Sequence, residues 1–91
     1  MYLTTRIDWY AILEDLAYQM GEVQGDARVP MSTSAMAAAL CVARGTLRGW
    51  LEGSEPRHTD GEVLLVRWCA LTGKARAFAP RERRSLTAAQ R

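Results

Sequence analysis

The sequence predicts an all-α fold, a small four- to five-helix domain. Apolar residues recur at the spacing of one helical face in several stretches, and glycine or proline stands between those stretches. No stretch shows a strand pattern or an internal repeat. The chain has 91 residues, of which 48% are hydrophobic, so it suits one globular domain with one modest core.

The N-terminal part of the chain is expected to form one helix over about Arg6–Met20. The run Thr5–Asp8 fits a capping box, in which both side chains bind free backbone N–H groups of the first turn. The apolar stripe of this helix contains Trp9, Leu13, Leu16 and Met20. Gly21–Met31 is expected to be a polar connection, with the pair Gly25-Asp26 as its turn.

Two short helices separated by a tight turn are expected within Ser32–Gly53. Thr33–Leu40 is rich in alanine, which has the highest intrinsic helix propensity, and Ser32 stands where an N-cap would accept a free backbone N–H. The second helix, Arg44–Leu51, carries an apolar face formed by Leu47, Trp50 and Leu51. Val42 is apolar in the middle of the turn, so we expect it to be buried and to fix the angle between the helices.

A longer helix is expected after the loop that contains Pro56. Thr59 or Asp60 is its predicted cap, and it should end near Thr72, because Gly73 suits the position just after a helix. Its apolar stripe contains Leu64, Leu65, Trp68 and Leu71.

Residues 80–91 are expected to be a basic C-terminal tail. Pro80 suits the first turn of a short helix over Arg81–Gln90, but Leu86 and a few alanines supply the only apolar content there. Three roles stay open for this tail: a dimer contact, an unstructured arm that neutralises DNA phosphates, and a solvated segment that binds nothing.

Six positions within Ser32–Gly53 form a pattern, which consists of Met36, Ala37, Val42, Leu47, Trp50 and Gly53. This pattern resembles the helix-turn-helix of the Cro/C1-type family, the lambda-repressor-like regulators of phages and plasmids. The resemblance extends over about Ile7–Gly73 as a helical domain, although only Ser32–Gly53 carries the motif. It implies that Arg44–Leu51 is a recognition helix, which enters the major groove of DNA.

Two positions depart from the family pattern. Cys41 stands where the family usually has glycine, so this residue would need an unfavourable backbone conformation if the turn is left-handed. Ala43 stands where the family usually has serine or threonine to cap the second helix.

The resemblance implies that base edges are contacted from the start and the exposed side of the second helix. The residues concerned are Arg44, Gly45, Thr46, Arg48 and Gly49. Arg44 is the best candidate for direct readout, because its guanidinium can donate two hydrogen bonds to guanine, whereas Arg48 could reach a base or a phosphate. Each glycine costs the helix roughly 1 kcal/mol relative to alanine, so either the backbone approaches DNA closely or glycine is merely tolerated.

Phosphate contacts are expected at the start of the first short helix and in the loop after the second. The residues concerned are Thr33, Ser34, Arg57 and His58. His58 is the only histidine of the chain, and a bland alternative is that it is simply exposed.

Charge is distributed unevenly along the chain. Residues 1–40 carry two arginines against five carboxylates, whereas residues 41–91 carry ten lysines and arginines against five carboxylates. Positive charge therefore begins near the second short helix, which favours nucleic acid as a partner.

Other classes of protein are disfavoured. The chain has no apolar run long enough to span a bilayer and no visible signal peptide, so we expect a cytoplasmic protein without membrane contact. Cys41 and Cys69 lack the spacing of a zinc site, and we expect reduced, partly buried thiols rather than a disulfide. No nucleotide-binding or nucleophile motif is present, so neither an enzyme nor a cofactor or small-molecule ligand is expected; a cysteine–His58 dyad is the enzymatic alternative.

The resemblance implies a transcriptional regulator, most simply a repressor that binds a pseudo-palindromic operator in double-stranded DNA as a homodimer. Residues 1–79 would form the DNA-binding domain, with the motif at about 33–53. The alternative is a helix-turn-helix module that docks on another protein, and an exposed Trp9 or Trp68 would favour it.

Overall fold

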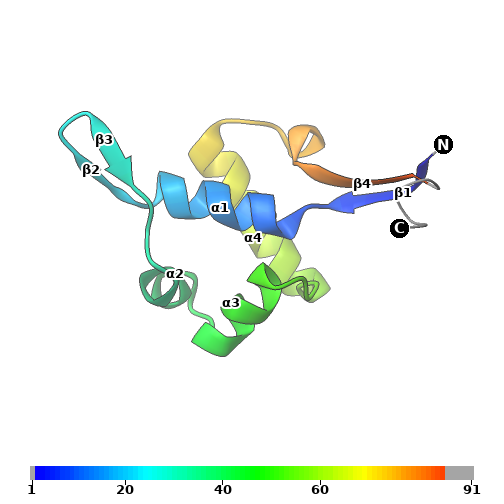
Figure 1. The fold of residues 1–91 in the computed structure, drawn as a ribbon, viewed down its shortest axis with the longest axis horizontal. Coiled ribbons are helices and arrows are strands. Elements are labelled where there is room, and N and C mark those ends of the chain that lie inside the picture. Colours follow the sequence, from blue (N-terminus) through cyan, green and yellow to red (C-terminus); the bar gives the residue numbers. More distant parts are fainter. Residues whose placement is uncertain (1, 86–91) are drawn as a thin grey trace.

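The computed structural model describes the backbone of residues 2–85 and the side chains of residues 6–82, and its fold contains both helices and strands (Figure 1). The order of elements is β1 (Tyr2–Ile7), α1 (Trp9–Gln19), β2 (Glu22–Gln24), β3 (Ala27–Val29), α2 (Thr33–Leu40), α3 (Arg44–Leu51), α4 (His58–Thr72), the 3-10 helix η1 (Arg76–Phe78) and β4 (Arg81–Ser85). The prediction of an all-α fold is therefore wrong, because two antiparallel sheets of two strands each accompany the helices of the described residues.

The first strand replaces the start of the predicted N-terminal helix. The capping box predicted at Thr5–Asp8 is wrong, because β1 runs to Ile7 and α1 begins only at Trp9. Asp8 alone serves as the N-cap, and its Oδ1 accepts a hydrogen bond from the backbone N of Ala11 at 3.2 Å. The aromatic and β-branched residues of β1 favour an extended chain.

The strand β4 occupies the first part of the tail. It pairs antiparallel with β1, so that Arg6 lies opposite Glu82, and the two strands form one end of the molecule (Figure 1). The Arg6 guanidinium also pairs with the Glu82 carboxylate at 3.3 Å. Arg81–Ser85 is therefore not part of the short helix predicted over Arg81–Gln90, and residues 86–91 lie outside the described residues.

The polar connection predicted after the first helix is a β-hairpin. β2 and β3 pair antiparallel around Gly25, whose φ of 61° suits the first position of a two-residue hairpin turn. Gly21 has no room for a side chain, since a Cβ there would lie 2.0 Å from the carbonyl oxygen of Val29. The hairpin projects at the end of the molecule opposite β1 and β4 (Figure 1).

Helices α1, α2, α3 and α4 enclose an apolar core. Within the described residues, its buried members are Ile12, Leu13, Leu16, Met36, Ala37, Leu47, Trp50, Leu64, Leu65, Trp68 and Ala79. The buried indole of Trp68 donates a hydrogen bond to Asp15 Oδ2 at 2.9 Å, which ties α4 to α1 and leaves the indole N–H satisfied. Gly61 lets the same two helices approach closely, because a Cβ there would lie 3.0 Å from the ring of Trp9.

The longest helix, α4, ends at Thr72 as predicted but begins earlier than predicted. It starts at His58 with no side-chain cap, so the cap predicted at Thr59 or Asp60 is wrong. Three of its four predicted stripe residues are buried, whereas Leu71 is exposed. In Figure 1, α4 crosses behind α1, and both helices contribute residues to the core against which α2 and α3 pack.

Candidate nucleic-acid interface

The two short helices α2 and α3 have the predicted bounds. Ser32 caps α2 as predicted, its Oγ accepting a hydrogen bond from the backbone N of Ala35 at 3.2 Å. α3 buries Leu47 and Trp50 in the core, as its apolar spacing predicts. Val42, in the turn between the helices, is half-buried against the same core. Val42 thus packs the turn against the core. α3 contacts the core through the side that carries Leu47 and Trp50, and its other side faces solvent.

The turn requires a left-handed residue, and Cys41 supplies it. Its φ and ψ are 59° and 41°, and within residues 2–85 it is the only non-glycine residue with positive φ. This conformation costs a residue with a Cβ roughly 1–2 kcal/mol, a cost that glycine would avoid. The thiol of Cys41 is exposed, so the partly buried position predicted for it is wrong, whereas Cys69 is half-buried.

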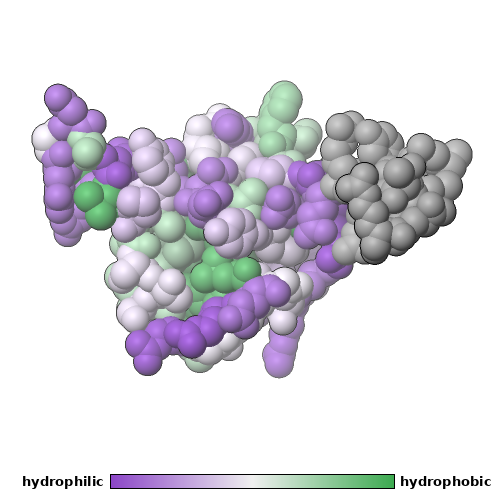
Figure 2. Space-filling model, viewed as in Figure 1, coloured by the Kyte–Doolittle hydropathy of each residue, from purple (hydrophilic) through white to green (hydrophobic). Residues whose placement is uncertain are grey.

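The outer side of α3 carries the residues predicted to contact bases. Arg44, Gly45, Thr46 and Arg48 are exposed, and Gly49 is half-buried. Hydrophilic side chains gather along the lower edge of the molecule in Figure 2, where Figure 1 places α3. One helix therefore presents a polar, positively charged face to solvent and an apolar face to the core.

Neither glycine of α3 is required by the packing of the chain itself. A Cβ at Gly45 would meet no atom within 4 Å, and a Cβ at Gly49 would lie 3.7 Å from Ser54 Oγ, an ordinary contact. Neither residue has a positive φ. The folded chain alone therefore gives no reason for glycine at these positions, and alanine would fit both.

The structure brings together one predicted base contact and one predicted phosphate contact. Arg44 Nη1 donates a hydrogen bond to Ser34 Oγ at 3.1 Å, across the angle between α3 and α2. Thr33, the other hydroxyl residue predicted to contact phosphate, is half-buried in the first turn of α2. Ala43, the N-cap of α3, offers no side-chain acceptor, so the first N–H groups of this helix have no side-chain cap. The first turns of the two helices thus form one polar surface.

The remaining predicted phosphate contacts lie elsewhere. Arg57 is the N-cap residue of α4 and His58 its first residue, and both are exposed. They line a groove with Trp9 and Arg76, and no described residue of α2 or α3 lines that groove. The structure therefore does not join Arg57 and His58 to the polar surface formed by Arg44 and Ser34.

A second apolar face on α4 is absent from the sequence-based prediction. Val63 and Val66 are 53% and 66% exposed, and Ala70 is also exposed. These residues recur at i, i+3 and i+7, which is the spacing of one helical face. The signal was therefore present in the sequence, beside the stronger stripe of buried leucines on the same helix.

Three further observations bear on the kind of site. Within the described residues, no group of three histidine, cysteine or carboxylate side chains could hold a metal ion. None of the helices between residues 2 and 85 has the length and apolar character needed to cross a membrane. Comparison of the chain with models of protein families, with curated proteins and with solved structures finds no match.

Proposed function

We propose that the protein is a sequence-specific regulator of transcription, most simply a phage- or plasmid-type repressor, that binds double-stranded DNA through α3. The observation that carries this proposal is the division of α3 into two sides. Leu47 and Trp50 are buried, whereas Arg44, Thr46 and Arg48 are exposed. An α-helix fits the major groove of B-DNA, and arginine is the side chain that most often contacts guanine there.

The charge of α3 suits this role. Arg44 and Arg48 lie one helical turn apart, and the helix contains no acidic residue. The second half of the chain, residues 41–91, has ten basic against five acidic residues, and such an excess attracts the phosphate backbone. Arg44 would donate to a guanine base edge, and Ser34 would contact the adjacent phosphate.

The small size of the reading surface supports a dimer. α3 has eight residues, and only its outer side is exposed, so one copy can contact few base pairs. Two copies related by a two-fold axis would read two half-sites and so double the length of the recognised sequence. We therefore propose a homodimer on a pseudo-palindromic operator.

The protein-docking alternative finds less support in the tryptophans. Trp68 is fully buried and Trp9 is half-buried, so neither presents an exposed indole to a partner. The alternative remains testable in the same experiment as the proposal, because a docking module would show no preference among DNA sequences.

Selection from a pool of random DNA duplexes tests the proposed function. The purified chain should enrich a pair of related half-sites separated by about one helical turn of DNA. Binding to the enriched duplex is then measured by fluorescence anisotropy against a shuffled duplex at several salt concentrations. Enrichment of no sequence, with equal affinity for both duplexes, would contradict the proposal.

A further inference from the structure

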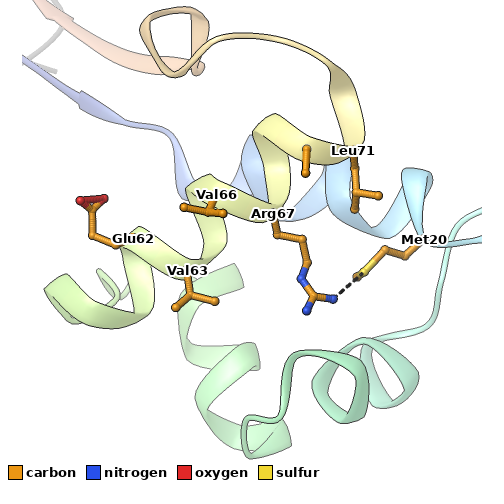
Figure 3. Close-up of a pocket in the computed structure, with 7 residues that line it drawn as sticks. Met20, Glu62, Val63, Val66, Arg67 and Leu71 are labelled. Atoms are coloured by element: carbon orange, nitrogen blue, oxygen red, sulfur yellow. Dashed lines mark hydrogen bonds between the residues drawn. The ribbon is translucent and has the colours of Figure 1, made fainter.

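We propose that the second apolar face of α4 is the surface through which two copies of this chain pack together, with their α4 helices antiparallel. This inference rests on the homodimer of the proposed function and names its contact surface. Val63, Val66 and Ala70 form this face, Thr59 extends it by one turn toward the start of α4, and all four residues are exposed. With Met20 and Leu71 beside them, Val63, Val66 and Ala70 line a groove of about 580 Å³ (Figure 3). Water-exposed valines in this arrangement are stabilised when a second apolar surface covers them.

The spacing of these residues makes the face complementary to itself. Thr59, Val63, Val66 and Ala70 follow the alternating three- and four-residue steps of a helix–helix seam. If a two-fold axis passes between Val63 and Val66, then Val63 of each copy meets Val66 of the other. Thr59 of each copy then meets Ala70 of the other. A contact in which the same patch serves on both copies is the usual form of a two-fold interface.

The charges beside this seam are complementary as well. In the same antiparallel arrangement, Asp60 of each copy lies opposite Arg67 of the other, twice across the axis. The ion pairs among the side chains of residues 6–82 involve Arg6 and Arg76, so neither Asp60 nor Arg67 is neutralised within its own copy. Arg67 Nη1 instead lies 3.9 Å from Met20 Sδ, a weak acceptor.

Glu62 disfavours a parallel arrangement of the two α4 helices. A parallel pair of α4 helices would place Glu62 of one copy near Arg67 of the other. However, the Glu62 carboxylate already accepts from the Arg76 guanidinium, which holds the pKa of Glu62 below its ordinary value. Only the antiparallel pair therefore provides partners for both unpaired charges, Asp60 and Arg67.

The antiparallel pair also places both reading helices on one side of the dimer. Asp60 and Val63 line a pocket with Val42 and Trp50, so this flank of α4 adjoins α2, α3 and their turn. Figure 3 shows Arg67 on the same flank, pointing toward Met20 on the side of α4 where α2 and α3 lie. The two-fold axis brings this flank of α4 to the same side of the dimer in both copies. The α2–α3 units of both copies would therefore approach one DNA duplex together.

The proposal is tested by sedimentation velocity of the full chain without DNA, over a wide range of concentrations. A contact through one helix face is small, and interfaces below roughly 1,200 Å² belong to weak or transient complexes, so association should depend on concentration. Val66→Glu should weaken association about tenfold or more, because a carboxylate would be buried in the seam. Val23→Glu is the matched control, since Val23 is 63% exposed on β2, and it should change association by less than about twofold.

Charge reversal tests the orientation. Arg67→Glu alone and Asp60→Arg alone should each weaken association by placing like charges opposite each other, and the double variant should restore it. At concentrations where the parent is monomeric, circular dichroism should show the parent melting temperature for Val66→Glu, Val23→Glu and Arg67→Glu, whose sites are exposed. A parent that stays monomeric at several hundred micromolar, or a dimer that Val66→Glu leaves intact, would overturn the proposal. A double variant that associates no better than the single variants would overturn the antiparallel arrangement.

These outcomes are separable from a failure of the proposed function. Association is measured without DNA, so it stands whether or not the chain recognises an operator. If both proposals hold, Val66→Glu should retain the parent affinity for a single half-site and lose the gain in affinity that the second half-site provides.

Discussion

Arg44 Nη1 donates a hydrogen bond to Ser34 Oγ at 3.1 Å, and this contact joins the first turn of α3 to the first turn of α2. Both side chains are exposed, so the contact contributes little to the stability of the folded chain. Its consequence is geometric: it holds a guanidinium beside a hydroxyl on the surface that faces DNA in the proposed complex. A side chain held in this way loses less conformational entropy on binding.

Ser32 and Ser34, at the start of α2, are expected to have different roles, Ser32 in folding and Ser34 in DNA binding. Ser34→Ala should weaken operator binding by about 0.5–1.5 kcal/mol while the melting temperature stays the same, because only a surface hydrogen bond is lost. Ser32→Ala should instead lower the free energy of unfolding by about 1 kcal/mol, because Ser32 caps α2. Anisotropy titrations and chemical denaturation measure the two effects, and the reverse pattern would show that the roles are misassigned.

Trp50 should be structural. It is 6% exposed and shares the buried side of α3 with Leu47, so Trp50→Ala should cost about 3–5 kcal/mol of the unfolding free energy. The unfolding free energy of a domain of this size is about 5–15 kcal/mol, so the variant should be partly or largely unfolded at 25 °C or melt at a much lower temperature than the parent. Thr46→Ala, on the exposed side of the same helix, is the control and should melt near the parent temperature. A Trp50→Ala variant that melts normally and only fails to bind DNA would make Trp50 a contact residue.

A substitution at Gly45 tests whether glycine is needed for the α3 backbone to approach DNA closely or is only tolerated in the helix. Gly45→Ala should raise the unfolding free energy by roughly 0.5–1 kcal/mol, because alanine favours the helix and a Cβ there meets no atom within 4 Å. If glycine allows the helix backbone to approach DNA, the same variant should bind the operator more weakly. Denaturation and anisotropy on one preparation give both numbers. Higher stability with undiminished DNA affinity would leave glycine without a role at this position.

Cys41 stores backbone strain in the turn. Cys41→Gly should raise the unfolding free energy by about 0.5–1 kcal/mol, since removal of the Cβ relieves the left-handed strain and costs some entropy of the unfolded chain. Cys41→Ala keeps a Cβ at φ 59° and should bring no gain, so it is the matched control. Equal stabilisation by glycine and alanine would place the effect in the thiol and not in the backbone.

The helices could be predicted because their signals are local. Ser32 as a cap, the alanines of α2 and Gly73 after α4 act within one or two turns of the helix that they define. The bounds of α2 and α3 therefore agree with the prediction. The two sides of α3 were predictable for the same reason, because burial of Leu47 and Trp50 follows from their spacing.

The strands depend on residues far apart in the chain. Arg6 pairs with Glu82, and nothing near Arg6 in the sequence indicates that partner. The Thr5–Asp8 run satisfies the rule for a capping box, and this local pattern outweighed the extended preference of β1. The hairpin did carry a local signal, because Gly25-Asp26 separates two short runs that each contain a valine.

The contact between Ser34 and Arg44 also lay beyond prediction. Both residues were candidates for DNA contact, but their meeting depends on the angle between α2 and α3. That angle is set by the left-handed Cys41 and the half-buried Val42 together. Spacing along the sequence fixes which side of a helix a residue occupies, but it does not fix the angle at which two helices meet.

The most direct test of the account compares the parent chain with Arg44→Ala on the selected operator and on each single base-pair variant of one half-site. If α3 reads bases through Arg44, the variant should lose about 1–3 kcal/mol of discrimination at one base pair of the half-site and keep the parent preferences at the others. Its melting temperature should match that of the parent, because Arg44 is exposed. An equal loss of affinity on every sequence, or no loss at all, would contradict base recognition by Arg44.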